Sequence, residues 1–299
     1  MIKSSNPYYE GYTLINYEFS TLCDKECSYC YNMYQHDKRF SIPHQKIIDD
    51  MTTILTADNP YLILILIGGE TLIQPKFEEI IDHIAKIKQP ETKIILYTHA
   101  DHEFNFFKSK IDTLKVFGDK IKIHCTLHWE NLNFEQFTKN IKYINDNFDY
   151  CTMFFFLNNM FLNNQNYIDN LLEIAPKLKL YALKFDGAKG LDLIKQVTLY
   201  KQIEKYNDRM DNTITINQMP YPHNIGMNIL YKETKYCFKG KRCTLLDYDI
   251  DKFGNVKMSC TNEILFNIRE NFDKSFFNLR TITCQENQCM SSLANLLVE

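Results

Sequence analysis

The sequence predicts an α/β protein in which a parallel sheet, covered by helices, occupies the first two-thirds of 299 residues. Apolar runs of strand length alternate six times with amphipathic stretches of helix length. The run 61–67 is apolar at every position, as in a parallel strand buried on both faces. Such alternation indicates βαβ units, whose right-handed crossovers would curl the sheet into a closed or partial barrel.

The six expected strands cover residues 12–19, 61–67, 93–98, 121–127, 151–157 and 180–185. The six expected helices cover residues 41–55, 75–87, 103–114, 133–148, 166–178 and 191–206. In the first helix, Ser41 is the expected N-cap and Pro43 lies in the first turn. Because the alternation ends near residue 210, we predict a barrel over residues 1–210 and a small cysteine-rich α+β domain over 211–299. Residues 213–217 and 227–231 are candidate strands of that second domain.

Composition and charge exclude some partners and favour metal chemistry. The net charge of −3 disfavours a nucleic-acid partner. No apolar stretch reaches 18 residues and the N-terminus is polar, so neither a membrane span nor a signal peptide is expected. Ten cysteines in a chain without a secretory signal point to a reducing, cytoplasmic location and to metal or redox chemistry.

Three of the cysteines, Cys23, Cys27 and Cys30, follow the first expected strand with C-x3-C-x2-C spacing. Three thiolates on one short loop can hold one corner of a [4Fe–4S] cluster, which normally takes four cysteine ligands. The fourth iron would then be open to a substrate or cofactor. A structural zinc loop is the alternative, although zinc sites usually have a fourth ligand nearby.

This spacing, with Tyr29 just before the last cysteine, resembles the signature of the radical S-adenosylmethionine (SAM) superfamily. The resemblance implies that Cys23, Cys27 and Cys30 are the catalytic cluster ligands and that the open iron chelates SAM. Reductive cleavage of SAM would give a 5′-deoxyadenosyl radical. It also implies an incomplete (β/α)6 TIM-like barrel with the cysteine loop at its C-terminal mouth.

A second motif, Gly68-Gly69-Glu70, ends the second expected strand at the same mouth. Taken alone it is an ordinary strand-to-loop turn in which glycine allows a close backbone approach. In the radical SAM superfamily a Gly-Gly-Glu here binds the amino group of SAM. Thr71 departs from the proline that often follows in that family.

Polar residues at the ends of the later strands are further candidates for SAM or substrate contacts. By the same resemblance, the expected SAM contacts are Tyr29, Thr98, Thr126 and Asn158. His128 and Glu130 form a His-x-Glu segment with an open role, as do Lys184 and Asp186 after the sixth strand. Cys125 and Cys151 lie inside expected strands and are interpreted as buried core.

Four later cysteines, Cys243, Cys260, Cys284 and Cys289, could form a second metal site. Strands at 245–250 and 256–259 with a turn at 252–255 predict a hairpin that brings Cys243 and Cys260 together. The spacing resembles the SPASM and twitch extensions of radical SAM enzymes, which implies an auxiliary [4Fe–4S] cluster. A zinc ribbon is the alternative, and the surplus Cys237 has an open role.

These observations predict a radical SAM enzyme that abstracts a hydrogen atom from its substrate. The resemblance favours peptide or protein modification, with oxidation or epimerisation of a sugar or other small molecule as the alternative. It also implies an electron donor of the flavodoxin or ferredoxin type. A non-catalytic iron–sulfur electron carrier is the other class considered, and Gly68-Gly69-Glu70 speaks against it because a carrier needs no SAM site.

Overall fold

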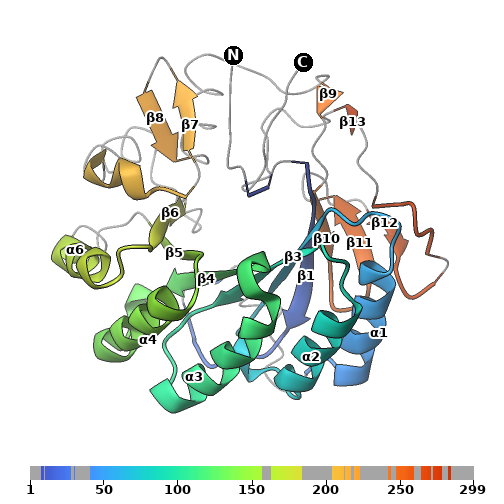
Figure 1. Cartoon of the computed structure of the whole chain (residues 1–299), viewed down its shortest axis with the longest axis horizontal. Helices are drawn as coiled ribbons and strands as arrows, with labels where there is room; N and C mark the ends of the chain where they lie inside the picture. Colours follow the sequence, from blue (N-terminus) through green and yellow to red (C-terminus); the bar gives the residue numbers. More distant parts are fainter. Residues whose placement is uncertain are drawn as a thin grey trace.

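The computed structural model contains one large sheet and two small ones (Figure 1). It describes residues 8–9, 11–27, 30, 41–156, 163–183, 204–211, 213–216, 219–222, 242–243, 247–258, 264–270, 272–277 and 282–283. No helix among these residues is long and apolar enough to cross a membrane.

The large sheet has nine strands in the order β12-β11-β10-β1-β2-β3-β4-β5-β6. Its first six strands in sequence run parallel to one another and confirm the predicted strands to within two residues. They are β1 Thr13–Ser20, β2 Leu62–Gly68, β3 Lys93–Thr98, β4 Ile121–Leu127, β5 Cys151–Phe156 and β6 Lys179–Leu183. The sheet is open rather than closed, as expected of a partial barrel.

Helices follow the strands as predicted. The α-helices are α1 His44–Leu55, α2 Phe77–Ile87, α3 Phe104–Thr113, α4 Phe134–Asn147 and α6 Gln165–Ile174. Short 3₁₀ segments are η1 Thr71–Ile73, η2 Leu114–Lys120, η3 Trp129–Asn131 and η4 Glu204–Arg209. The predicted start of α1 was wrong: the N-cap is Pro43 rather than Ser41, because the residue before a proline is held extended. Most of the predicted helix 191–206 lies outside the described residues.

The two faces of the sheet carry different residues. Figure 1 shows α1, α2, α3 and α4 side by side along one face, where the larger apolar core lies. Cys125 and Cys151 are buried in this core, which confirms their predicted role. The opposite, inner face carries a smaller cluster that includes Leu14, Ile65 and Phe154. Side chains alternate between the faces along each strand, so one sheet can build both clusters.

The inner face is closed at the amino ends of its strands by what we call the floor: Tyr8, Tyr9, Lys93, Lys122 and Asp211. The Lys122 Nζ donates to both carboxylate oxygens of Asp211 at 2.8 and 2.7 Å, and both side chains are buried. Lys93 Nζ donates to the Tyr8 carbonyl at 2.6 Å and lies 4.4 Å from the centre of the Tyr8 ring. Burial raises the pKa of Tyr9 well above its ordinary value. The floor therefore fills this end of the sheet with aromatic rings and paired charges.

The C-terminal hairpin extends the same sheet. Strand β10 Asp247–Ile250 pairs with β1 in parallel, and β11 Asn255–Met258 and β12 Ile264–Asn267 add antiparallel strands. This confirms the predicted hairpin, and Gly254 has the φ of +84° that its turn requires. Arg269 donates to both oxygens of the buried Asp50 at 2.9 and 2.7 Å. The segment thus packs on α1, and the division of the chain at residue 210 stays a prediction.

Two small antiparallel pairs lie beyond the large sheet, at the top of Figure 1. Strand β7 Thr213–Ile216 pairs with β8 Met219–Pro222, and β9 Arg242–Cys243 pairs with β13 Ile282–Thr283. The candidate strand at 213–217 is therefore confirmed as β7. The other candidate strand, 227–231, lies outside the described residues.

Candidate functional site

The cysteine loop leaves β1 and runs beside the end of β2. The Gly69 N–H donates to the Ser20 carbonyl at 2.7 Å, and the Glu70 N–H donates to the Leu22 carbonyl at 2.6 Å. Backbone pairing between the two chain segments therefore continues past the ends of both strands. Because of this pairing, Gly68-Gly69-Glu70 lies directly beside Cys23.

Both glycines are required by this close approach. A Cβ at Gly68 would lie 2.0 Å from the Ser20 carbonyl oxygen, and φ there is +138°. A Cβ at Gly69 would lie 2.1 Å from the Leu22 carbonyl oxygen and 3.1 Å from the Cβ of Cys23. Real Cβ atoms do not make contacts as short as those with the two carbonyl oxygens, so any side chain here would force the loop away from β2.

A cavity of about 160 Å³ lies at the carboxyl ends of the parallel strands. Barrel enzymes place their chemistry at this end of the sheet. The cavity is lined by the three cysteines of the loop, both glycines and the ends of β2, β3 and β4: Cys23, Lys25, Cys27, Cys30, Ile67, Gly68, Gly69, Tyr97, Thr98, His99, Thr126 and His128. The structure thus brings Thr98 and Thr126 together with the cysteine loop, and their predicted contacts with SAM stay predictions.

The three cysteines differ in their surroundings. Cys27 is buried, whereas Cys23 and Cys30 are partly exposed. Burial raises the pKa of the Cys23 thiol to about 11, against a backbone hydrogen bond from Lys25 that lowers it. The Cys30 N–H donates to the Cys27 carbonyl at 3.1 Å, which closes a four-residue turn. Binding of iron at Cys23 would have to displace the thiol proton, since the thiolate is the metal ligand.

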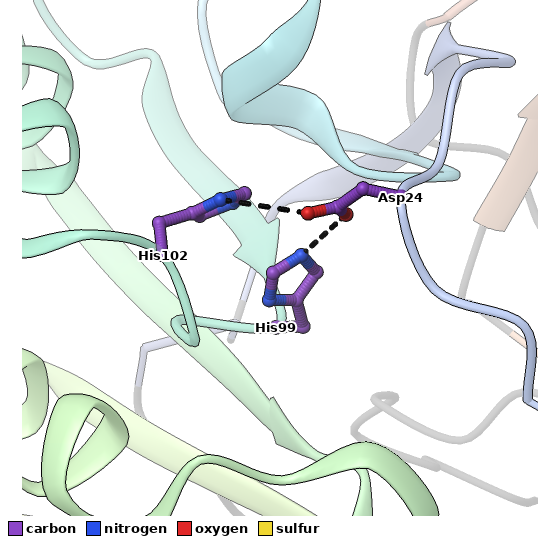
Figure 2. A group of neighbouring side chains, drawn as sticks. All are labelled: Asp24, His99 and His102. Atoms are coloured by element: carbon purple, nitrogen blue, oxygen red, sulfur yellow. Dashed lines mark hydrogen bonds and ion pairs between the residues drawn. The ribbon is translucent and has the colours of Figure 1, made fainter.

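Asp24, between the first two cysteines, lies against two histidines that follow β3 (Figure 2). His99 Nε2 lies 2.8 Å from Asp24 Oδ1, and His102 Nδ1 lies 3.8 Å from Asp24 Oδ2. One ligand atom from each of the three lies within 4.8 Å of the others, close enough to hold a metal ion. However, the Asp101 N–H donates to His99 Nδ1 at 3.0 Å, so the ring proton must sit on Nε2. His99 therefore donates to Asp24 and has no Nε2 lone pair for a metal.

Glu70 is fully buried beneath the same histidines. Its Oε1 accepts from the Leu72 N–H at 3.0 Å and its Oε2 accepts from the His99 N–H at 2.8 Å. Although burial raises the pKa of this carboxyl, the interactions of Glu70 with His99 and His102 outweigh that effect and lower the pKa to about 2. The Glu70 carboxylate thus ties the end of β2 to the end of β3, and its predicted contact with SAM stays a prediction.

Lys25 anchors the middle of the cysteine loop to two later turns. Its Nζ donates to Asp101 Oδ2 at 2.5 Å and to the Asn131 carbonyl at 2.9 Å. The same Asp101 oxygen accepts from the Asn133 N–H at 3.1 Å, just before α4. Because the side chains of Lys25 and Asp101 are 14% and 3% exposed, salt in the solvent weakens this ion pair little.

His128, the residue after β4, has a side chain that reaches the second cysteine. Its Nδ1 lies 3.4 Å from the Cys27 Sγ. Burial lowers the pKa of His128 to about 4. Glu130, two residues on, is exposed and does not line the cavity, so the structure separates the two members of the His-x-Glu segment.

Sequence reasoning missed four residues that hold the loop: Asp24, Lys25, His99 and His102. Their contacts join segments 75 to 106 residues apart, a range at which spacing carries no signal. One signal was present in the sequence: these polar residues lie inside the cysteine loop or directly after the third expected strand. Segments that follow parallel strands meet at the same edge of a sheet, so their side chains could have been expected to lie close together.

Several predicted site residues lie outside the described residues: Tyr29, Asn158, Lys184, Asp186, Cys237, Cys260, Cys284 and Cys289. Cys243 is described only in its backbone, which pairs with Ile282 in the β9–β13 ladder. That ladder ends one residue before Cys284 in sequence. The auxiliary ligand set therefore stays a prediction.

Comparison with known proteins gives one family and a set of related folds. Residues 17–160 match the model of the radical SAM superfamily. A structure of histidine-tagged anSMEcpe with bound AdoMet superposes with a TM-score of 0.58 at 13% identity, covering 90% of this chain and 80% of that one. The structure of Streptococcus suis SuiB bound to precursor peptide SuiA superposes with a TM-score of 0.59 at 14% identity, covering 87% of this chain and 63% of that one. At these identities the likeness shows a shared fold. No curated protein sequence matches the chain.

Proposed function

Because this chain belongs to the radical SAM superfamily through residues 17–160, we propose that it is an enzyme that cleaves SAM reductively and abstracts a hydrogen atom from a peptide or protein. The superfamily uses a [4Fe–4S] cluster and SAM. When bound, these cofactors supply a carbon-centred radical after one-electron reduction. The rest of the chemistry depends on how this chain holds them and shields the substrate.

The observation that carries the proposal is the cavity at the mouth of the barrel. Cys23, Cys27 and Cys30 all line it, beside two glycines whose missing Cβ atoms keep the loop in place. Three cysteines that line one space fit a cluster that leaves one iron open for SAM. The fit is specific to this end of the sheet, since the floor at the other end is filled by rings and paired charges.

Individual residues then take defined roles. The three cysteines would hold the cluster, and the Gly68 and Gly69 backbone would approach the methionine end of SAM. Thr98 and Thr126, on the neighbouring strands β3 and β4, both line the same cavity. Thr98 Oγ1 already accepts from the Ala100 N–H at 3.1 Å, so Thr126 is the better candidate for a hydrogen bond to SAM.

We place an auxiliary [4Fe–4S] cluster on Cys243, Cys260, Cys284 and Cys289. Two backbone observations support it: the hairpin between β10 and β11, and the β9–β13 ladder, which puts Cys243 opposite a residue two positions before Cys284. Residues 211–299 would then form the auxiliary domain, even though part of this segment joins the large sheet.

A peptide is the substrate class that we propose. A structure of anSMEcpe contains both AdoMet and a Cp18Cys peptide, and it has a TM-score of 0.57 to this chain at 12% identity. The SuiB structure contains its precursor peptide SuiA. These two relatives of the same fold support a peptide substrate for this chain. A donor of the flavodoxin or ferredoxin type would supply the electron.

Anaerobic reconstitution with iron and sulfide tests the proposal. We expect about eight irons per chain, and 5′-deoxyadenosine on addition of dithionite and SAM. The triple variant Cys23→Ala, Cys27→Ala, Cys30→Ala should keep about four irons, those of the auxiliary cluster, and form no deoxyadenosine. The variant Cys125→Ala, in the helix-side core, is the matched control and should keep both clusters. Iron binding without deoxyadenosine under any reductant would contradict the proposal.

A further inference from the structure

The contact between His128 and Cys27 joins a side chain of the cavity wall to a sulfur of the cysteine loop. The Nδ1–Sγ distance of 3.4 Å is within hydrogen-bonding range for sulfur. An imidazole N–H is a donor and a thiolate is an acceptor, so the pair fits a charge-assisted hydrogen bond.

The backbone that carries this ring is held by the turn that follows β4. His128 precedes the 3₁₀ segment Trp129–Asn131, and its carbonyl accepts from the Asn131 N–H at 3.3 Å. Parallel pairing of β4 with β3 and β5 fixes the position of the turn. His128 therefore meets Cys27 from the sheet scaffold rather than from within the cysteine loop.

The neighbouring cysteine shows a contrast. Cys23 is contacted by a backbone N–H, that of Lys25, within its own loop. Cys27 is contacted by a side chain from a different element, which a substitution can change without altering the loop sequence. Of the two donors, His128 is thus the adjustable one.

A hydrogen bond to a cluster sulfur has a predictable electrochemical effect. Reduction adds one negative charge to the cluster, so a donor at a ligand sulfur stabilises the reduced form more than the oxidised form. Hydrogen bonds to the sulfurs are among the factors that set reduction potentials of iron–sulfur clusters. Partners of metal ligands also affect metal affinity and ligand orientation.

We propose that His128 is a positioning residue whose Nδ1–H donates to the Cys27 sulfur and raises the reduction potential of the SAM-binding cluster. This inference rests on the proposed function, because it assumes a cluster on Cys23, Cys27 and Cys30. It gives His128 a role through the cluster rather than a direct contact with SAM or substrate. The same residue would thereby ease electron transfer from the donor protein.

The test compares His128→Phe with His128→Asn in the reconstituted full chain. Asparagine places its amide N–H close to the position of Nδ1, whereas phenylalanine keeps the ring and removes the donor. The midpoint potential of the cluster, followed by electron paramagnetic resonance without SAM, is the readout. We expect His128→Phe to lower the ratio of reduced to oxidised cluster, measured at a fixed potential, about tenfold. For one electron this corresponds to a midpoint potential lower by about 59 mV. His128→Asn should restore most of that shift.

Two further variants keep the outcome decisive. His83→Phe is the matched control, since His83 bonds Thr52 between α1 and α2, and its cluster should keep the wild-type potential. If His128→Phe loses iron, His128→Asn is compared with His128→Gln, whose amide reaches the Nε2 position instead. The inference would be overturned if His128→Phe and wild type had the same midpoint potential at equal iron content. It would also be overturned if His128→Asn and His128→Gln had the same midpoint potential. If the reconstituted wild-type chain formed no deoxyadenosine, the proposed function would be overturned instead.

Discussion

The two ends of the inner face of the sheet are built in opposite ways. At the carboxyl ends of the strands, two glycines and three cysteines border a cavity. At the amino ends, the floor closes the same face with Tyr8 and Tyr9 and with the Lys122–Asp211 pair. Both ends contain buried charges, but their partners differ. At the floor the Lys122–Asp211 pair joins β4 to the segment that follows η4, whereas at the mouth the Lys25–Asp101 pair ties the cysteine loop to the turn after β3.

This difference separates stability from function along one set of strands. In barrels, the amino end contributes stability and the carboxyl end carries chemistry. We therefore expect changes at the floor to unfold the protein while the folded fraction keeps its cluster. Changes at the mouth should remove iron or SAM at a smaller cost in unfolding free energy. Four substitutions test this separation.

The largest loss of stability is expected for Lys122→Met. It leaves the Asp211 carboxylate buried without its bidentate cation, and breaking a buried pair in this way costs about 3–5 kcal/mol. Urea unfolding followed by circular dichroism measures the change. The double variant Lys122→Met, Asp211→Leu removes both charges and should recover most of the loss. A single variant as stable as wild type would show that the floor pair is dispensable.

Gly68→Ala should be next in size and should act at the mouth. The new Cβ would meet the Ser20 carbonyl at a backbone conformation that disfavours side chains, at a cost of about 3 kcal/mol. Iron content should fall as well, because the cysteine loop moves away from β2. Gly118→Ala is the control: φ there is +57° but nothing lies within 4 Å, so about 1 kcal/mol and full iron content are expected.

The same contrast explains what the sequence could predict. The strands were predictable because a run such as 61–67 is apolar throughout, and the cysteines because their spacing is local. Glu70 was predicted as a SAM ligand, but its surroundings depend on His99 and His102, which approach from another strand. The Lys122–Asp211 pair spans 89 residues and has no local signature. The local sequence pattern therefore could not predict polar contacts between residues that are far apart in the chain.

Lys25→Met tests whether the loop anchor serves the cluster. It removes two hydrogen bonds and leaves the buried Asp101 with its remaining N–H partner, at about 1–3 kcal/mol. We expect slower iron incorporation, measured by the rise of cluster absorbance during reconstitution. Lys108→Met is the control, because the Lys108–Asp112 pair on α3 is partly exposed and should change stability by less than about 0.5 kcal/mol. Equal incorporation rates in both variants would argue against the anchor.

Thr126→Val should have the smallest effect and the most local one. Valine keeps the shape of the side chain and removes a hydroxyl that lines the cavity on β4. If that hydroxyl bonds SAM, the Kd for SAM should rise about fivefold, as for one neutral hydrogen bond of about 1 kcal/mol. Iron content should stay at the wild-type level, because no cysteine is touched. Thr138→Val on α4 removes a hydrogen bond to Tyr167, and neither residue lines the cavity, so the Kd should stay unchanged. If Thr126→Val bound SAM as tightly as wild type, the hydrogen bond to SAM would have to come from another strand end. If its iron content fell, Thr126 would instead support the cysteine loop.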